Sequence, residues 1–555
     1  MFFSDTIFKS KEEKYMDIYK LSLIIFLSIS MQNAFAKIYK WVDEEGNVQF
    51  SDRAPPSLRE NFNFKKNQTP DVKREQKISK PVLGEKRSIN NKPFSENIIL
   101  SIRMLLDGKK FLELNEALHA HQTVAEKNIY AEDALFTAYN AFEIKSRSYE
   151  SIFNEWVNTT PDNYQPYLAR ARFYYRLAWE ARGGKWASET KKDKLEIMKT
   201  YFSKSAEDIV QALKLYEKSM IAYSLLIGIY NSIGKGNETE LIVNKAIKFN
   251  SATFHVRRQY LRALTPRWGG SYEKMKLFVI DSMHYVNSNS KLKLLEGYIY
   301  LDLANLQQII KKYSVAGEYY NKALEFGLNH KILKERGENS YRRENYKDAL
   351  KDLNRAIQLY TEDADYYYWR SKTYRKLKEY ANATTDIERA YELDPYDKYI
   401  LSQRNWLASK MTYLAYQLSK KQKPTEAIEK YDVALNLDPT NADLHYRKAR
   451  ALIESNKHNQ ALDEIEQAIQ INSDDINYYL LVDYILAKSR SWDKIISHWD
   501  NFIERNPNVS RAYVERGGSY YRKGDMKSAV RNAKIAADMG NIEGIEAYEK
   551  FKHFQ

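Results

Sequence analysis

A pattern of small and bulky residues recurs at a fixed distance in the C-terminal half of the chain. Ala427 and Ala434 flank the bulky Tyr431, and residues 461–468 repeat this order 34 positions later. Spacings of three and four residues place side chains on one face of a helix. A period of about 20 to 50 residues is typical of stacked units, because one unit cannot bury its apolar face alone. The repeat therefore predicts an all-α helical solenoid.

The full spacing, Ala-x3-bulky-x2-Ala-x4-Pro, resembles the second helix of the tetratricopeptide repeat (TPR) family. Alignment on it gives seven units, which are residues 297–329, 330–363, 364–397, 408–441, 442–475, 476–509 and 510–543. About ten residues inserted between Asp397 and Ala408 predict either a longer first helix in the fourth unit or a protruding loop. We expect residues 544–555 to form a capping helix. The resemblance implies a TPR-type solenoid that serves as a protein-binding scaffold.

The N-terminal segment has the features of a secretion signal. Its apolar run, residues 21–29, is shorter than the roughly 20 residues that a membrane-spanning helix needs. The sequence Ala-Phe-Ala that ends at Ala36 supplies a cleavage site with small residues. We therefore expect residues 1–36 to be a signal peptide that starts at Met16 and is cleaved after Ala36, with an uncleaved anchor as the alternative. The mature chain is then periplasmic or secreted, without a transmembrane segment.

Residues 37–56 are predicted to form a small β-hairpin module. The run 38–55, IYKWVDEEGNVQFSDRAP, places β-branched and aromatic residues around a turn at Gly46. It resembles domain-of-unknown-function family 4124, which implies a Gram-negative cell envelope and no established chemistry. Because a two-stranded hairpin is marginally stable alone, we expect its aromatic residues to dock on another surface, with a sugar-binding platform as the alternative. These residues are Tyr39, Trp41 and Phe50.

A basic linker is predicted at residues 57–94. The chain has a net charge of +14, and half of it lies between Arg53 and Lys92, where eleven basic residues face four acidic ones. The segment contains prolines and no helical period, so we expect it to be extended and disordered. It is either a solvated tether or a contact for a cell-envelope polyanion. No nucleic-acid partner is expected.

Residues 95–290 are predicted to form a second helical domain. Two landmarks, AWEARGG at 178–184 and PRWGGS at 266–271, resemble domain-of-unknown-function family 4034, which implies no activity. The glycines of the second landmark suit a helix end, and Ser271 suits the position before a new helix. The alternative is that the glycine pair and Arg267 hold an anion.

No pattern in the sequence is typical of catalysis. The absence of cysteine excludes disulfides, thiolate metal sites, a thiol nucleophile and a lipoprotein anchor. The nine histidines are scattered, and the close pair His119 and His121 points to different sides of a helix. No metalloprotease, nucleophile-elbow or glycine-rich nucleotide motif occurs. We therefore predict that the chain is not an enzyme and uses no cofactor or metal.

The TPR resemblance implies a binding groove on the first helix of each unit, at positions two, five, nine, twelve and thirteen. The residues that we predict for it are Tyr341, Arg342, Tyr368, Lys372, Arg375, Tyr446, Arg450, Tyr521 and Arg522. Tyrosine and arginine suit an extended protein or peptide partner with acidic groups. The alternative is that these residues only solvate a groove that the hairpin or the linker fills. The family's two-carboxylate clamp needs Lys and Asn where this chain has Lys334 and Glu338, so we do not expect that clamp.

Overall fold

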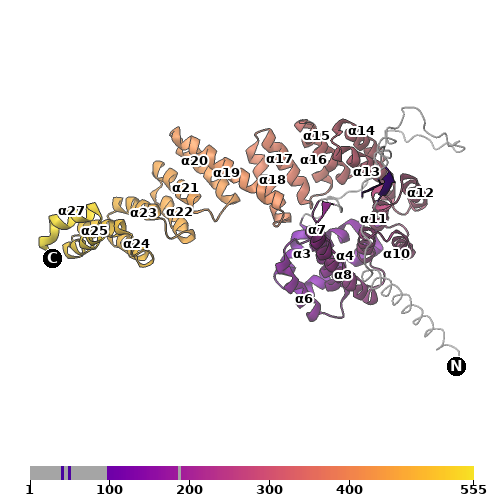
Figure 1. The fold of residues 1–555 in the computed structure, drawn as a ribbon, viewed down its shortest axis with the longest axis horizontal. Helices are drawn as coiled ribbons and strands as arrows, with labels where there is room; N and C mark the ends of the chain where they lie inside the picture. The colour runs from indigo at the N-terminus through magenta and orange to yellow at the C-terminus, as the bar shows by residue number, and fades with distance from the viewer. Residues whose placement is uncertain (1–38, 43–47, 52–96, 185–188, 555) are drawn as a thin grey trace, which may run out of the picture. The chain divides into compact units, whose positions relative to one another are not determined.

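The computed structural model describes residues 39–42, 48–51, 97–184 and 189–554 (Figure 1). In the N-terminal part, the backbones of β1 (Tyr39–Val42) and β2 (Val48–Ser51) pair antiparallel, with Tyr39 opposite Ser51. The predicted signal peptide, the predicted linker and the side chains of the predicted docking residues Tyr39, Trp41 and Phe50 lie outside the described part. These expectations stay predictions.

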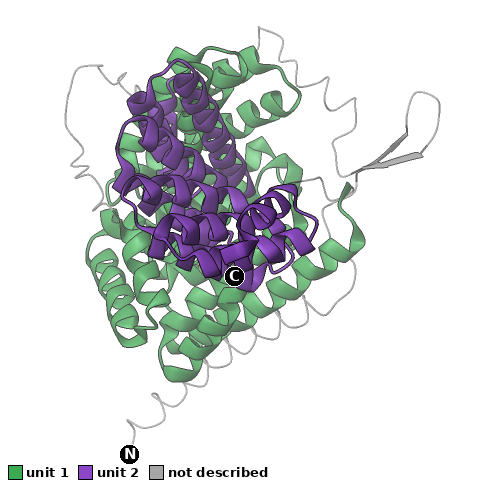
Figure 2. Ribbon diagram, turned by 90° about the vertical axis from the view of Figure 1, so that its left-hand side faces the viewer, with its two compact units in different colours: residues 1–378, 389–397 green, residues 379–388, 398–555 purple. Residues whose placement is uncertain are grey.

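The chain divides into two compact units (Figure 2). Unit 1 comprises residues 1–378 and 389–397, and unit 2 comprises residues 379–388 and 398–555. From residue 97 onward, every regular element that the structure describes is a helix. The all-α, TPR-like fold predicted from the 34-residue repeat is thereby confirmed.

The helices of unit 1 belong to the predicted second helical domain and to the first repeats. They are α3 (Ile98–Asp107), α4 (Phe111–Lys127), α5 (Glu132–Asn140), α6 (Glu150–Thr159), α7 (Tyr164–Arg182), α8 (Lys192–Leu215), α9 (Met220–Ser232), α10 (Gly236–Phe249), α11 (Phe254–Ala263), α12 (Tyr272–Met283), α13 (Leu295–Ile309), α14 (Tyr313–Leu324), α15 (His330–Arg342), α16 (Tyr346–Leu359) and α17 (Ala364–Lys376). Short 3-10 turns are η1 (Ile129–Ala131), η2 (Arg147–Tyr149), η4 (Pro266–Trp268) and η5 (Ser290–Leu294).

The remaining helices carry the later repeats, and α18 (Tyr380–Leu393) is shared between the two units. They are α19 (Lys398–Lys420), α20 (Pro424–Leu437), α21 (Ala442–Glu454), α22 (His458–Ile471), α23 (Ile476–Lys488), α24 (Trp492–Arg505), α25 (Ser510–Lys523), α26 (Met526–Asp538) and α27 (Ile542–Phe551), followed by η6 (Lys552–Phe554). Helix α19 has 23 residues, whereas α21 has 13. Of the two alternatives for the insertion before Ala408, the lengthened helix is therefore correct.

The recurring small and bulky residues form the core of the repeats. In α20, Ala427, Tyr431 and Ala434 are buried, and the corresponding residues of α22 include the fully buried Ile465. Full burial of such an apolar side chain contributes about 1.5–3 kcal/mol. The small residues let neighbouring helices approach, and the bulky ones fill the space between them. The spacing in the sequence thus reflects the packing of successive helices.

The PRWGGS landmark forms a structural corner between α11 and α12. Gly269 has a positive φ of 85°, and a Cβ on Gly270 would lie 2.0 Å from the carbonyl oxygen of Leu264. The Ser271 hydroxyl accepts the N–H of Lys274 at 3.2 Å and caps α12, as predicted. Since Arg267 pairs with Asp302 at 3.3 Å, the anion-holding alternative for this motif is not supported.

The helices α3–α5 contact segments far along the chain. The carboxylate of Glu362, just before α17, accepts the N–H groups of Ile98 and Ile99 at 2.5 and 2.8 Å. These two groups belong to the first turn of α3, where N–H groups have no partner within the helix. Arg103 donates to the carbonyl oxygen of Leu393 at 2.5 Å, and Lys145 pairs with Asp394 at 2.6 Å.

A second carboxylate, Glu132, caps α11 in the same way. The Thr253 hydroxyl donates to its Oε1, and the Phe254 N–H donates to its Oε2 at 2.9 Å. The next residue, Asp133, accepts from His255 at 2.8 Å and pairs with Lys291. Residues 98–145 therefore brace the segments that precede or begin α11, α13 and α17, a role that their place in the sequence does not indicate.

Candidate functional site

Four of the predicted groove residues gather around Trp369 on α17. The ammonium of Lys372 lies 4.2 Å from the ring centroid of Trp369, and 5.2 Å from those of both Tyr341 and Tyr368. The guanidinium of Arg342 lies 5.5 Å from the Trp369 centroid. Cations within about 6 Å of an aromatic face are attracted by its quadrupole. The structure thus brings together residues from two successive first helices, α15 and α17.

The cations of this cluster repel one another and are partly withdrawn from water. Burial lowers the pKa of Lys372, and the charges of Arg375 and Arg342 lower it further. The positive charge of Arg342 is balanced by Glu338, whose Oε1 accepts a hydrogen bond from Nη2 of Arg342 at 2.6 Å. Trp369 is only 8% exposed, so it forms the floor of the cluster. Its position in the repeat, the sixth, is not one of the groove positions, so it was not among the predicted groove residues.

In unit 2 the predicted residues form two separate groups. The guanidinium of Arg450 lies 5.9 Å from the Tyr446 ring, which also contacts Tyr478 at 5.4 Å. By contrast, Tyr521 packs against Phe551 with centroids 5.1 Å apart. Arg522 lies 5.8 Å from the ring of Trp492, the first residue of α24. Tyr521 and Arg522 therefore contact the C-terminal helices and are not brought together with Tyr446 and Arg450.

Two further tyrosine–cation pairs lie on first helices of unit 2 and were not among the predicted groove residues. Lys420 lies 4.7 Å from the ring centroid of Tyr416 on α19, and Lys488 lies 4.8 Å from that of Tyr484 on α23. Both rings are well exposed, 39% for Tyr416 and 51% for Tyr484. They occupy positions nine and thirteen of their repeats, so the rule that selected the other groove residues would have found them.

Lys334, the lysine that a two-carboxylate clamp would use, is already neutralised by carboxylates of this chain. Lys334 pairs with Asp365 at 2.6 Å, with Glu335 at 3.1 Å and with Glu338 at 3.6 Å. These carboxylates raise its pKa above the ordinary value, against the burial that lowers it. Lys334 therefore has three internal partners in the position where the clamp would need it for a ligand.

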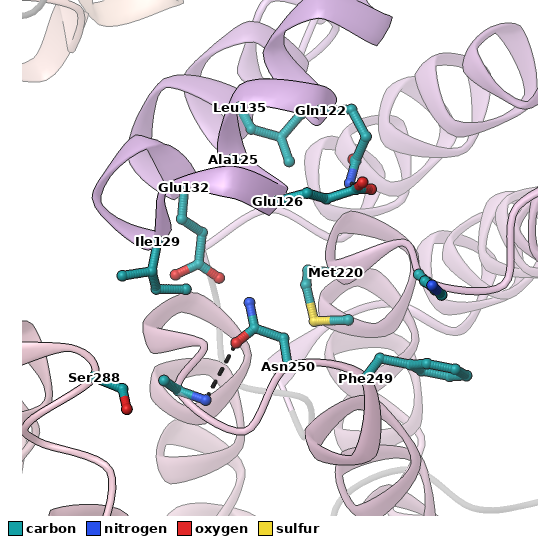
Figure 3. A pocket seen from close by; sticks show the side chains of 12 residues that line it. Gln122, Ala125, Glu126, Ile129, Glu132, Leu135, Met220, Phe249, Asn250 and Ser288 are labelled. Carbon is teal, nitrogen blue, oxygen red and sulfur yellow. Dashed lines mark hydrogen bonds between the residues drawn. The ribbon is translucent and has the colours of Figure 1, made fainter.

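A pocket of about 250 Å³ lies in unit 1, between α4, α5 and the segments around α9 and α10 (Figure 3). Gln122, Glu132, Met220, Phe249 and Asn250 are among its lining residues. Burial raises the pKa of Glu132 to about 7, against its hydrogen bonds, which lower it. Both carboxylate oxygens of Glu132 already accept hydrogen bonds from the start of α11. In this part of the pocket wall, Glu132 therefore holds α11 in place and is not available to a ligand.

The described ranges contain no arrangement for a metal and no candidate membrane span. Among residues 97–184 and 189–554, no three or more His, Asp or Glu side chains are placed to hold an ion. None of the helices described there is both long and apolar enough to cross a lipid bilayer.

Comparison with protein-family models gives four matches. Two are to tetratricopeptide repeats, at residues 335–398 and 418–483. A domain of unknown function, family 4034, matches residues 98–252, so the PRWGGS landmark lies beyond the matched range. Another, family 4124, matches residues 25–80.

Similar curated proteins match only part of the chain. A DnaJ homolog subfamily C member 7 homolog of Dictyostelium discoideum is 25% identical over 169 residues, which are 30% of this chain and 31% of the relative. An Hsp70-Hsp90 organizing protein of Triticum aestivum is 26% identical over 206 residues, 37% of this chain and 34% of the relative. The matched segments thus span about a third of the length of these relatives.

Solved structures that match part of the chain include YrrB, described as a TPR protein with an unusual peptide-binding site. It is 22% identical with a TM-score of 0.22, and the match covers 35% of this chain and 94% of that one. MamA protein is 19% identical with a TM-score of 0.22, covering 32% and 92%. The repeat spacing, the helix pairs and the family models agree that the chain contains tetratricopeptide repeats, and other segments of it match the 4034 and 4124 families of unknown function.

Proposed function

We propose that this chain is a non-catalytic scaffold that binds a protein or peptide partner through the first helices of its repeats. TPR units support a role in protein–protein interaction, and the Hsp70-Hsp90 organizing proteins among the relatives have names that describe such a role. The finer proposal concerns where the partner binds and what chemistry it carries.

The observation that carries the proposal is a tyrosine–cation pair on each of three successive first helices. These pairs are Tyr416 with Lys420, Tyr446 with Arg450, and Tyr484 with Lys488. In every pair the cation follows the tyrosine by four residues, so both lie on one side of the helix. Tyr416 and Tyr484 stand at position nine of their repeats, and Tyr446 stands one helical turn earlier, at position five. The pairs therefore recur along one side of α19, α21 and α23 and make a repeated surface rather than an isolated contact.

Such a surface suits an extended partner with acidic groups. A tyrosine ring offers a large contact area at a small cost in conformational entropy, which is why it is frequent at binding hot spots. The adjacent lysine or arginine provides charge-assisted hydrogen bonds to carboxylates. We further propose that the partner is met outside the cytoplasm, since the signal-like residues 1–36 end at the cleavage site after Ala36. N-terminal sequencing of the mature protein tests this by locating Lys37 as its first residue.

The binding proposal is tested by a triple variant, Tyr416→Ala, Tyr446→Ala and Tyr484→Ala. Wild-type protein is used to capture and identify a partner from a cell-envelope extract, and the affinity of the purified pair is then measured. The triple variant should lose at least about tenfold in affinity, because removal of a hot-spot aromatic costs about 2 kcal/mol or more. Tyr130→Ala serves as the control, since Tyr130 is exposed but lies outside the repeats.

Equal affinity of the triple variant and the wild type would show that the partner binds elsewhere. The salt dependence of binding then distinguishes the tyrosine-bearing surface of the repeats from the basic linker as the binding site. Binding to a polyanion through the basic residues between 53 and 92 should weaken steeply between low and moderate salt, whereas binding that rests on tyrosine rings should change less.

A further inference from the structure

Three cations in unit 1 make no direct ion pair with a carboxylate among the described residues. Arg258 and Arg262 lie one turn apart on α11, and Lys331 is the second residue of α15. The structure gives their side chains no hydrogen bond or ion pair with any described residue. Arg262 is exposed to solvent, and Arg258 and Lys331 are half-buried. These three residues are called the cation cluster below.

The cluster stands out because comparable arginines in the same unit are neutralised. Arg170 pairs with Asp208 at 2.7 Å, and Arg336 pairs with Asp352 at 2.6 Å, each through two guanidinium nitrogens. An unpaired charge that is half withdrawn from water is unfavourable unless something offsets it. We therefore expect additional negative charge near these cations from outside the described residues.

The brace formed by α5 places the two helices that carry the cluster. His255, one turn before Arg258, stacks on Phe136 of α5 with centroids 4.0 Å apart. His330, next to Lys331, stacks on Tyr360, whose hydroxyl lies 3.0 Å from that of Thr137 on α5. Two adjacent residues of α5 thus contact the start of α11 directly and the start of α15 through Tyr360. Packed rings thus fix the helix segments from which Arg258 and Lys331 extend.

The cations are close enough to repel one another. The charge of Arg258 is the largest cause that lowers the pKa of Lys331 to about 7, and burial and Arg262 add to it. Asp363 and Glu143 raise the pKa of Lys331 and so offset part of this repulsion, but neither of them forms an ion pair with it. Glu143 pairs with Arg172 at 2.6 Å, and Asp363 accepts the N–H of Asp365 at 3.0 Å.

A glycine on the neighbouring helix α9 leaves room for neutral donors beside the cluster. A Cβ on Gly228 would lie 2.5 Å from the hydroxyl oxygen of Tyr175 and 3.0 Å from the side-chain nitrogen of Gln259. Tyr175 also lies close enough to Arg262 to interact with its charge. The hydroxyl and the amide are therefore seated over this glycine, next to the guanidinium groups.

From this juxtaposition we propose that Arg258, Arg262 and Lys331 form a binding site for a multiply charged oxyanion, a phosphate or polycarboxylate group. Guanidinium groups match the planar geometry of such anions with paired hydrogen bonds, and an ammonium adds a point charge. The anion adds to the counter-charge of Asp363 and Glu143 and relieves the remaining repulsion within the cluster. This site lies on helices other than those of the three tyrosine–cation pairs, so its test is independent of the proposed function.

The test uses the full chain, inorganic phosphate and citrate, with sodium chloride at matched ionic strength as the reference. Thermal unfolding and calorimetric titration are measured for the wild type, for Arg258→Gln and for the control Arg336→Gln. Phosphate or citrate should raise the melting temperature of the wild type and bind saturably. Arg258→Gln should weaken that binding by about tenfold or more, because hydrogen bonds to charged groups are strong.

The stability of the anion-free variants distinguishes a ligand site from a structural one. Without an anion, Arg258→Gln should raise the melting temperature since it removes repulsion, whereas Arg336→Gln should lower it because it leaves Asp352 unpaired. Saturable binding of neither anion by the wild type would overturn the proposal. It would also be overturned by unchanged anion binding in Arg258→Gln, or by a lower melting temperature of this variant in the absence of an anion.

Discussion

The carboxyl group of Glu132 makes part of the brace sensitive to pH. Its pKa is raised from 4.5 to about 7, chiefly by burial. The folded state therefore binds the proton more tightly than the unfolded state does. The stabilisation by this group is complete below pH 4.5, is lost as the pH rises toward 7, and does not change further above that. A shift of this size corresponds to about 3 kcal/mol, at 1.4 kcal/mol per unit.

We predict that Glu132→Gln abolishes the loss of stability that the wild type shows as the pH rises from 4.5 to 7. The amide oxygen of glutamine can accept the N–H of Phe254, and its nitrogen can donate to the Thr253 hydroxyl, so the cap on α11 is kept without a charge. At pH 8 the variant should be more stable than the wild type, by up to about 3 kcal/mol less the strength of the lost charge-assisted bond. Near pH 4.5 the two proteins should be equally stable.

The assay has to be local, because a solenoid of this length need not unfold in one step. Hydrogen exchange of peptides that cover the start of α11 reports the opening of this cap at pH 5, 6, 7 and 8. Glu126→Gln is the matched control, since Glu126 is an exposed glutamate at the same pocket. The reasoning is refuted if Glu132→Gln exchanges faster than the wild type at pH 8, or if the difference between them does not grow from pH 5 to pH 8.

Three further predictions concern single positions. Glu362→Ala should destabilise α3 by about 2 kcal/mol, because two N–H groups lose their acceptor, and limited proteolysis should then cut within that helix. Asp483→Asn should raise stability at pH 7 by about 1 kcal/mol, allowing for solvent screening, and the gain should shrink toward pH 4 in urea titrations. Burial raises the pKa of Asp483 to about 6, and the indole N–H of Trp499 donates to it at 3.2 Å. Gly228→Ala should lower the melting temperature by crowding the Tyr175 hydroxyl, and Tyr175→Phe in that background should restore part of it.

The sequence predicts the repeats well because their energetics are local. Ala427, Tyr431 and Ala434 contact neighbouring helices of the same array, so the spacing within one unit reports the packing of every unit. The longer helix α19 was one of two alternatives for the insertion, and only the structure decided between them. The corner at Gly269 and Ser271 was also predictable, since a positive φ and a helix cap depend on residues close in the chain.

The brace could not be predicted in this way. Glu132 and Phe254 are separated by 122 positions, and Ile98 and Glu362 by 264. A buried glutamate near a helix start has no periodic signature, because its partner lies in another part of the fold. Trp369 was missed for a related reason. Its ring is largely buried, yet it gathers the cations of two helices, and only the structure shows which side chains lie over it.

The two tyrosine–cation arrangements offer different chemistry to an acidic ligand. In unit 1, Lys372 lies over three rings and its pKa is lowered, so its charge is partly withdrawn from water and would gain more from a carboxylate than a solvated lysine does. Arg342 in the same cluster already has Glu338 as a partner, and a ligand must compete with that carboxylate. In unit 2, Lys420 covers a single exposed ring, so salt screens its attraction to a ligand more strongly. We therefore predict that affinity for an acidic ligand from the cluster around Trp369 persists at salt concentrations that weaken the charged contacts of α19.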